Sequence, residues 1–474
     1  MTVACRGRHR FENPVWPSAS QILRLERIEV ELSQLLGTAF ECPCGKTHRL
    51  PVRKYVYDSA AMEQLPGIVR DCGGAMLSPR TVVVADTRTW EVCGRRAFAA
   101  LKRMRVDVAE VIVADGKHGT PTCDDATFQD LLTRLRDAGP GMVVGVGSGV
   151  INDLCKWTSF ELGIPYLVVA TAPSMNGYAA ANVAPTVGGV KVLIEARPPR
   201  AVIAEPDVIT GAPQEMIAAG FGDTIAKYQS NSDWRMNHLL LGEYYCDFCA
   251  GIVGNLEPLY LSRPEGIRER NASAVGGLFA ALFWSGVAMT LVGTSAPASG
   301  GEHLLSHTLD MIAMARGHRH DLHGRQVGVG TLLSAALYEK ILAVEAPALR
   351  VLPPQVDKHF WGSGPVVEAV AKQYEAKKAS LDAVRHCLTQ QRGWDRLRSH
   401  LADLPRSPQT VRDWLQRAGG ATSPEAIGCS AEQLREAALH MHEIRKRFTV
   451  VDLAWMLGVL PDSLDEIVQT WLSR

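Results

Sequence analysis

The sequence predicts an α/β domain with a parallel sheet over residues 1–212 and an all-helical domain over residues 213–474. In the first half, short apolar runs without polar alternation recur between helix-like segments, which is typical of parallel strands buried on both faces. From Gln214 onward the apolar residues follow a helical period almost throughout, and β-branched runs become rare. A boundary near residue 212 separates the two patterns.

The predicted elements follow in chain order. Serine cap residues and an amphipathic pattern indicate a first helix over residues 18–36. Strands that end in polar or glycine-rich turns are expected at 81–89, 110–115, 141–149 and 164–174. Helices are expected between them at 94–104, 126–139 and 151–163, and the last strand-rich stretch covers 191–213. In the second half, we interpret 263–270 and 350–365 as loops and 345–440 as helical scaffold.

Composition and charge describe a globular protein with a large core. The 474 residues are 46% hydrophobic and 21% charged, and fifty basic residues balance fifty acidic ones. The sequence contains no Lys/Arg-rich run that would indicate a nucleic-acid partner. The apolar stretch 276–293 is shorter than the roughly 20 residues that span a bilayer, so we expect a buried helix and no membrane span. The N-terminal residues lack the apolar core of a signal peptide, and we therefore expect a cytoplasmic location.

Eleven scattered cysteines indicate reduced thiols. Two close groups occur, "CPCGKTH" with Cys42, Cys44 and His48, and "CDFC" with Cys246 and Cys249. Neither group has a second half at zinc-finger spacing. We expect the second pair to occupy adjacent core positions on a helix, and an extra metal at the first group is the weaker alternative.

A glycine-rich turn between a strand and a helix, "VVGVGSGVIND" at 143–153, is a candidate anion site. It is not a complete G-x-G-x-x-G fingerprint, because Val and Asn stand at positions 150 and 152. A turn without a ligand therefore stays an alternative. Asp86, Thr171 and Ser174 stand at other predicted strand ends, where open α/β sheets bind ligands. Together these turns favour a nucleotide site.

Three histidines and one aspartate suggest a metal site. In "GGEHLLSHTLDM", His303 and His307 lie one helical turn apart, and at this point a structural role in the core and a role as ligands both stay open. His323 follows in "LHGRQVG". Asp223 stands in the apolar "AAGFGDTIAKY", where an unpaired buried carboxylate would be costly and a metal would remove the cost. Oxygen and imidazole ligands suit Zn²⁺, Ni²⁺ or Fe²⁺.

Five motifs in this order resemble the sn-glycerol-1-phosphate dehydrogenases of the iron-containing alcohol dehydrogenase and dehydroquinate synthase-like superfamily. They are "GVGSGVINDL", "TAPSMNGY", "AAGFGDTIAKYQSNSDW", "SAPASGGEHLLSH" and "LHGRQVGVG". The resemblance spans roughly residues 45–340, and "RKRFTVVDLAWMLGVL" near the C-terminus is also similar. It implies a Rossmann-like sheet domain, a helical domain and an active site in the cleft between them.

The resemblance also implies a reaction and roles for residues. The reaction is the reversible reduction of dihydroxyacetone phosphate by NADH or NADPH to sn-glycerol 1-phosphate, which belongs to phospholipid metabolism. The enzyme is expected to bind one divalent metal (Zn, Ni or Fe) and to form a homodimer. The resemblance places a metal on Asp223, His303 and His323, and makes Asp223 and His307 catalytic. It places the substrate against Asn176, Asp223 and His307. For the cofactor it implies a ribose contact at Asp86, nicotinamide contacts at Thr171 and Ser174, and a pyrophosphate turn of Gly147, Ser148, Gly149, Val150 and Ile151. Lys227, one turn beyond Asp223, is a candidate for the substrate phosphate, with a structural lysine as the alternative.

Two departures from the family pattern concern the substrate. Asn176 stands where the family usually has an aspartate that contacts substrate, and Ala180 stands where a serine commonly touches the cofactor. A related polyol phosphate is therefore an alternative substrate. Two other functions are alternatives: a cyclase of the 3-dehydroquinate synthase type and a noncatalytic descendant of the family. Such cyclases carry a glutamate where Asp223 stands, and a noncatalytic descendant would have lost its metal ligands, so the sequence counts against both. Asp86 favours NADH, whereas the nearby Arg88 is able to accept the 2′-phosphate of NADPH.

Overall fold

The computed structural model describes residues 32–73 and 80–473. Its centre is a six-stranded sheet in the order β3-β12-β7-β6-β4-β5, in which every pairing is parallel. The strands are β3 (Lys54–Tyr57), β4 (Thr81–Asp86), β5 (Val108–Val113), β6 (Met142–Gly147), β7 (Tyr166–Ala170) and β12 (Ala201–Ala204). The parallel α/β sheet predicted from the sequence is confirmed, and the predicted helix over 18–36 lies mostly outside the described residues.

The direction in which the strands are wound reverses between β4 and β6. From β4 the chain continues outward to β5, whereas from β6 it continues in the opposite direction to β7 and then to β12. In open parallel sheets a ligand binds where the direction of winding reverses, outside the carboxyl ends of the two strands. Here those ends are Asp86 of β4 and Gly147 of β6.

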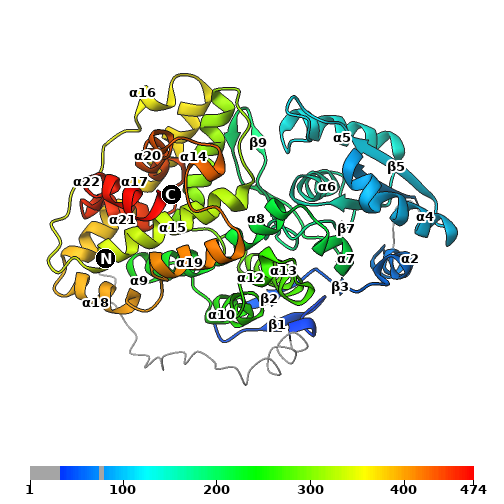
Figure 1. Ribbon diagram of the computed structural model, residues 1–474, viewed down its shortest axis with the longest axis horizontal. Helices are drawn as coiled ribbons and strands as arrows, with labels where there is room; N and C mark the ends of the chain where they lie inside the picture. The colour runs from blue at the N-terminus through cyan, green and yellow to red at the C-terminus, as the bar shows by residue number, and fades with distance from the viewer. Residues whose placement is uncertain (1–31, 74–79, 474) are drawn as a thin grey trace.

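Helices cover both faces of the sheet, which explains why the strands lack polar alternation. Val82 and Val84 of β4 pack with α5 (Asp125–Ala138) and α6 (Gly149–Glu161) on one face. Val83 and Ala85 pack with α2 (Ala61–Gly73) and α4 (Arg95–Arg103) on the other face. Both sets of side chains are fully buried, and the layers are visible at the right of Figure 1.

Short antiparallel pairs flank the sheet. β1 (Ala39–Glu41) pairs with β2 (Thr47–Arg49) before the first sheet strand. After β7, β8 (Asn182–Val183) pairs with β11 (Ile194–Glu195), and β9 (Thr186–Val187) pairs with β10 (Val190–Lys191). The sequence analysis did not identify β1, β2 or β3 as strands, because runs of three or four residues carry little periodic signal.

After β12 the described chain is helical. The helices are α7 (Pro206–Thr210), α8 (Gln214–Ile225), α9 (Lys227–Leu241), α10 (Asp247–Leu256), α11 (Pro258–Leu261), α12 (Glu265–Arg268), α13 (Ala272–Val292), α14 (Gly301–Ala315), α15 (His323–Leu342), α16 (Lys358–Trp361), α17 (Pro365–Thr389), α18 (Gly393–Leu401), α19 (Pro408–Ala418), α20 (Ala431–His440), α21 (Val450–Met456), α22 (Val459–Asp462) and α23 (Leu464–Ile467). One-turn helices α12 and α16 lie within stretches that we interpreted as loops. The change from strands to helices agrees with the two predicted patterns, and the boundary at residue 212 stays a prediction.

Helix α13 contains the apolar stretch of the sequence. By length and composition it is able to cross a membrane, but 89% of its most apolar window is buried inside the protein. It lies between α10, α7 and α8, and its side chains form part of the main core. The burial favours a core helix, as predicted.

Close backbone contacts join α8 to α15, α15 to α14, and α8 to the turn after β7. A Cβ atom on Gly324 of α15 would lie 1.9 Å from the carbonyl oxygen of Ala219 in α8. On Gly330 it would lie 2.2 Å from the carbonyl oxygen of Glu302 in α14, and on Gly220 it would lie 1.7 Å from that of Pro173. No side chain fits at these three positions without moving a backbone.

We predict that Gly324→Ala lowers the free energy of unfolding by about 1–3 kcal/mol, because the methyl group forces α8 and α15 apart. Gly67→Ala is the matched control. Gly67 lies inside α2 with no atom within 4 Å of the added carbon, so alanine there raises stability by up to about 1 kcal/mol. Chemical denaturation measures both variants, and equal effects of the two substitutions would contradict the close packing.

Candidate active site

Asp223, His303 and His323 come together from three helices, α8, α14 and α15. One ligand atom of each lies within 4.8 Å of those of the other two. The Nε2 atom of His303 is 3.5 Å from Oδ1 of Asp223, and the ring centroids of His303 and His323 are 5.2 Å apart. Asp223 is fully buried and His303 nearly so. The geometry brings together the three residues proposed from the sequence as metal ligands.

The hydrogen bond of His303 leaves its Nε2 atom free to bind a metal. Its Nδ1 atom lies 2.8 Å from Oε1 of Glu302, which also accepts the backbone N–H of Gly300. A carboxylate accepts only, so Nδ1 carries the proton and the lone pair is on Nε2. This carboxylate–histidine pairing is the usual second contact of a metal-bound imidazole.

His323 is held in the same tautomer by a different pair of residues. The hydroxyl of Ser306 donates to the side-chain oxygen of Gln326 at 2.9 Å and lies 2.9 Å from Nδ1 of His323. Since the hydroxyl proton is already donated, the oxygen accepts from Nδ1–H, and Nε2 again has the lone pair. Burial and the nearby His303 lower the pKa of His323 to about 4, so the ring is neutral at physiological pH.

Asp223 is held as a carboxylate. The backbone N–H of Asn176 donates to Oδ2 at 2.9 Å, and the side-chain amide of Asn176 donates to Oδ1 at 3.0 Å. Burial alone would raise the pKa of this carboxyl, but Lys227 and the two imidazoles outweigh burial and hold the pKa well below its usual range. A buried anion beside two imidazole lone pairs fits a divalent cation with one oxygen and two nitrogen ligands.

Lys227 has protein partners for all three of its N–H donors. The ammonium is buried and donates to the carbonyl oxygen of Asp223 at 2.6 Å, to Oδ1 of Asp223 at 3.2 Å and to the carbonyl oxygen of Ala298 at 3.0 Å. These contacts match the structural alternative weighed in the sequence analysis. The contact of Lys227 with a substrate phosphate stays a prediction.

His307 faces the same site from the next turn of α14. A buried guanidinium N–H of Arg445 donates to its Nε2 atom at 3.0 Å, while its Nδ1 atom is buried without a hydrogen-bond partner. Burial and the charge of Arg445 lower the pKa of His307 well below its usual value. The neutral ring therefore carries its proton on Nδ1, where a donor is left for a bound molecule.

Sequence reasoning assigned no role to four residues that orient the site: Arg445, Glu302, Ser306 and Gln326. Three of them lie inside motifs that we quoted for the resemblance, and Arg445 opens the motif "RKRFTVVDLAWMLGVL". A further cation, Lys191 of β10, also lowers the pKa of both His307 and His323. The motifs were visible in the sequence, but the partner of each side chain was not.

The predicted cofactor residues lie at or just beyond the carboxyl ends of β4, β6 and β7. Asp86 ends β4, and its Oδ1 atom accepts the N–H groups of Arg88 at 2.8 Å and Thr89 at 3.0 Å, which caps the short helix α3 (Thr87–Thr89). Gly147 ends β6, where a Cβ atom would lie 2.6 Å from that of Ile151. Ser148 precedes α6 without capping it through its side chain, so N–H groups of the first turn are available to an anion.

The turns after β6 and β7 contact each other. The hydroxyls of Ser148 and Ser174 are hydrogen-bonded, and the N–H of Thr171 donates to the carbonyl oxygen of Gly147 at 3.2 Å. Asn176, which holds Asp223, is two residues beyond Ser174. One turn therefore joins the predicted nicotinamide contacts to the metal ligands.

Arg88 is engaged by an acidic partner. Its guanidinium forms two bonds to the carboxylate of Asp115, at 2.5 and 3.1 Å, and its Nε atom is 3.4 Å from Asp86. A 2′-phosphate would compete with both carboxylates for the same guanidinium.

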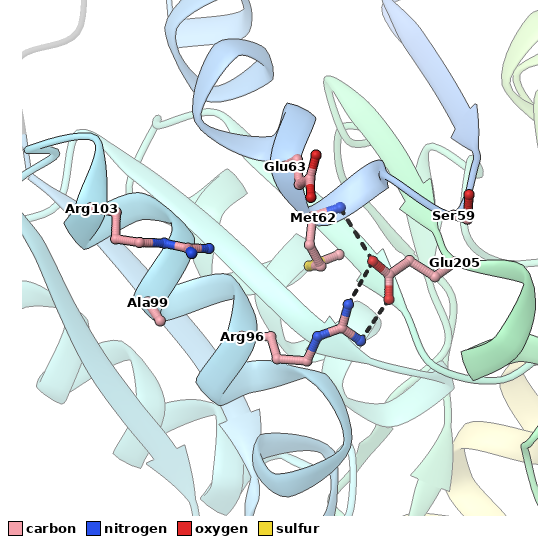
Figure 2. A pocket seen from close by; sticks show the side chains of 7 residues that line it. All are labelled: Ser59, Met62, Glu63, Arg96, Ala99, Arg103 and Glu205. Carbon is pink, nitrogen blue, oxygen red and sulfur yellow. Dashed lines mark hydrogen bonds and ion pairs between the residues drawn. The ribbon is translucent and has the colours of Figure 1, made fainter.

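A separate hollow of about 320 Å³ lies between α2, α4 and the end of β12. Figure 2 shows Arg96 facing Glu205 across it, with N···O distances of 2.7 and 2.8 Å. It shares no residue with the predicted site. Arg96 and the buried carboxylate of Glu205 neutralise each other, and the charged side chains of Glu63 and Arg103 also line the hollow.

Known proteins resemble this chain in sequence and in fold. The sequence model of the family described as iron-containing alcohol dehydrogenase matches residues 56–213. A glycerol-1-phosphate dehydrogenase (NAD(P)+) of Thermococcus kodakarensis is 35% identical over 265 residues, which are 55% of this chain and 72% of that protein. The chain belongs to the glycerol-1-phosphate dehydrogenase family.

Other members of the glycerol-1-phosphate dehydrogenase family match a larger share of the chain. The enzyme of Geobacillus stearothermophilus is 29% identical over 422 residues, covering 89% of this chain and 96% of that protein. Solved structures show the same fold at lower identity. Glycerol dehydrogenase of Schizosaccharomyces pombe matches with a TM-score of 0.56 and 15% identity, over 88% of this chain and 91% of that one.

We predict that Ser306→Ala lowers the affinity for a divalent metal about 10-fold or more, because His323 loses the acceptor that fixes its tautomer. Ser334→Ala is the control, since Ser334 is buried on the same helix as His323 and its hydroxyl has no hydrogen-bond partner. Metal titration monitored by calorimetry measures both variants. Equal affinities of the Ser306 and Ser334 variants would refute the role of Ser306.

Asp233, behind Glu302, makes stability depend on pH. Burial and the nearby Glu302 raise its pKa from 3.8 to about 8. Between these two pKa values the folded protein keeps a proton on Asp233 that the unfolded chain has lost. The contribution of Asp233 to the free energy of unfolding is therefore complete below about pH 4 and disappears as the pH rises toward 8. We predict that the stability difference between the wild type and Asp233→Asn shrinks over this range. Chemical denaturation at several pH values measures this difference in the free energy of unfolding, and Asp395→Asn, at an exposed position, is the control. A difference that does not change with pH would contradict the protonated state of Asp233.

Proposed function

We propose that the protein is an NAD(P)-linked, metal-dependent glycerol-1-phosphate dehydrogenase that interconverts dihydroxyacetone phosphate and sn-glycerol 1-phosphate. The observation that carries the proposal is the buried group of Asp223, His303 and His323, joined through Asn176 to the predicted nicotinamide turn. The family relationship supports the same activity. The homodimer and the cytoplasmic location stay predictions.

In this proposal Asp223, His303 and His323 hold one divalent cation, whose identity among Zn, Ni and Fe stays open. A bound cation supplies a Lewis acid that polarises the substrate carbonyl and stabilises negative charge on its oxygen. The residues around it keep His323 neutral and Asp223 ionised before substrate arrives. The burial of Asp223 and His303 restricts water around the reacting atoms.

His307 is proposed to orient the substrate. Its Nδ1–H is the unpartnered buried donor beside the metal ligands, and Arg445 holds the other nitrogen. It is placed to donate a hydrogen bond to a substrate oxygen and to a water molecule beside it, and the proton that the oxygen gains comes from solvent through that water. The low pKa of His307 keeps the ring neutral, so Nδ1–H stays a donor while Nε2 accepts from Arg445.

The cofactor is proposed to lie along these strand ends from Asp86 to Ser174. The adenosine ribose meets Asp86, the pyrophosphate meets the turn at residues 147–151, and the nicotinamide lies near Thr171 and Ser174. The support is the reversal of strand order between β4 and β6 and the free N–H groups at the start of α6. The Arg88–Asp115 pair supports NADH over NADPH.

Asn176 supports a second candidate substrate, a related polyol phosphate. Its side-chain amide donates to Asp223, whereas an aspartate at this position has no donor and would place a second carboxylate against the first. The space that the family's aspartate uses for substrate therefore differs in this chain. The choice between the two substrates is an experimental question for the metal-loaded protein.

We predict that metal-loaded protein oxidises NADH with dihydroxyacetone phosphate, and that His307→Gln lowers kcat/KM about 10²- to 10⁴-fold. The loss of reduced-nicotinamide absorbance measures the rate, and metal analysis of the same samples shows whether the metal is retained. His400→Gln, an exposed histidine of α18, is the control.

Two outcomes separate the candidates. If the folded, metal-loaded protein leaves NADH and NADPH unchanged with dihydroxyacetone phosphate, the first substrate is wrong. Oxidation with another phosphorylated ketone would then support the second. A His307→Gln variant with wild-type kcat/KM would remove His307 from the reaction.

A further inference from the structure

Among residues 32–73 and 80–473, metal-type side chains gather in two places, and the second contains no active-site residue. It consists of Cys42, Cys44 and His48 from the β1–β2 hairpin and Cys246 at the start of α10. The two cysteine motifs of the sequence, about 200 positions apart, are therefore the two halves of one cluster. We expected Cys246 and Cys249 to occupy only core positions on a helix, but Cys246 also belongs to this cluster.

Three of the six distances between the ligand atoms match the edges of a tetrahedral zinc site, and the other three are within 4.8 Å. The sulfurs of Cys42 and Cys246 are 3.7 Å apart, and Nε2 of His48 is 3.5 Å from the sulfur of Cys44 and 3.6 Å from that of Cys246. With Zn–S of about 2.3 Å and Zn–N of about 2.0 Å, the edges of a tetrahedron are about 3.8 Å between sulfurs and about 3.5 Å between sulfur and nitrogen. The sulfurs are too far apart for a disulfide, whose S–S bond is about 2.05 Å.

His48 points its lone pair at the sulfurs. Its Nδ1 atom lies 2.8 Å from the carbonyl oxygen of Leu291 in α13, so Nδ1 carries the proton and Nε2 is free. His48 is buried, and the residues around its Nε2 atom are thiols. A histidine fixed by a backbone carbonyl and directed at three sulfurs has the arrangement of a metal ligand.

Further hydrogen bonds favour thiolates at this cluster. The N–H of Cys249 lies 3.5 Å from the sulfur of Cys246, and the hydroxyl of Tyr244 lies 3.1 Å from the sulfur of Cys44. Lys46 is 3.4 Å from the centre of the Tyr244 ring. Gly45, at φ of 85°, permits the tight turn that places Cys42 and Cys44 on the same side.

We propose that Cys42, Cys44, His48 and Cys246 bind a structural Zn²⁺ ion that is distinct from the metal of Asp223, His303 and His323. All four positions of the tetrahedron are protein ligands, so no position is open for a substrate. Three thiolates and an imidazole select zinc, whereas the oxygen and nitrogen ligands of the other site accept harder metals. Cys249 lies outside the set, with its sulfur 3.9 Å from Nε2 of His48.

The zinc would fasten the N-terminal hairpin to the helical part of the protein. Strands β1 and β2 have three residues each, too few for a stable hairpin. Figure 1 shows both strands at the lower centre of the view, beside helices α10 and α13. The other contacts that hold them there include the rings of Phe40 and Phe248, 5.5 Å apart. The chain enters β3 directly after this anchor, so the site positions the edge strand of the sheet.

The test uses the full chain carrying His303→Ala, which removes the other metal site. We expect one zinc ion per chain after purification, and a strong thiolate-to-metal charge-transfer band after replacement by Co²⁺. Cys246→Ser in this background should reduce the zinc to a small fraction and abolish the band. Cys249→Ser, the matched control, should retain both.

Several results would overturn the proposal. These are a folded His303→Ala chain without zinc, a Cys42–Cys246 disulfide in non-reducing mass spectrometry, and a loss of zinc in Cys249→Ser that does not occur in Cys246→Ser. If Cys246→Ser does not fold, the cobalt spectrum of the Cys249→Ser chain decides alone. A thiolate band supports the site, and its absence refutes it.

Discussion

Helices α8 and α15 cross with their backbones in contact, and the arrangement of the proposed metal ligands depends on this crossing. Asp223 lies next to Gly222, and His323 lies next to Gly324; a Cβ atom on Gly222 would lie 2.2 Å from the carbonyl oxygen of Gly324. Neighbouring glycines bring α14 and the turn after β7 to the same point. Interiors pack at crystal density, so even one methyl group in this crossing would separate ligands that must lie within a few ångströms of each other.

Charge compensation at the site follows from its burial. The fully buried Asp223 is matched by Lys227 and by two N–H donors of Asn176, and Asp233 keeps its proton. His323 and His307 are neutral because burial and neighbouring cations lower their pKa values. A neutral imidazole is the form that binds a metal or donates a neutral hydrogen bond. His323 and His307 are therefore neutral, and Asp223 is ionised, before any ligand binds.

The sequence was sufficient to predict the parallel sheet and to single out the three side chains that the structure brings together as candidate metal ligands. Buried strands such as Thr81–Asp86 have a clear apolar signal, and the motif around His303 is contiguous. The sequence was insufficient wherever a role depends on a partner distant in the chain. The contact of Arg445 with His307 spans 138 positions, and that of Cys42 with Cys246 spans 204. Spacing rules search for ligands within one segment, so a site divided between a hairpin and a helix does not match them. Asn176 was noted as a departure, but only its two hydrogen bonds to Asp223 show what the amide does.

Anomalous diffraction from crystals of the metal-loaded protein tests the central claim most directly, because it locates the ion itself. Our account predicts an anomalous peak about 2.0–2.2 Å from an Asp223 oxygen and from Nε2 of both His303 and His323, with Asn176 still bonded to Asp223. A fully loaded crystal with no peak between these three side chains, or a peak bonded to Nδ1 of either ring, would contradict the account.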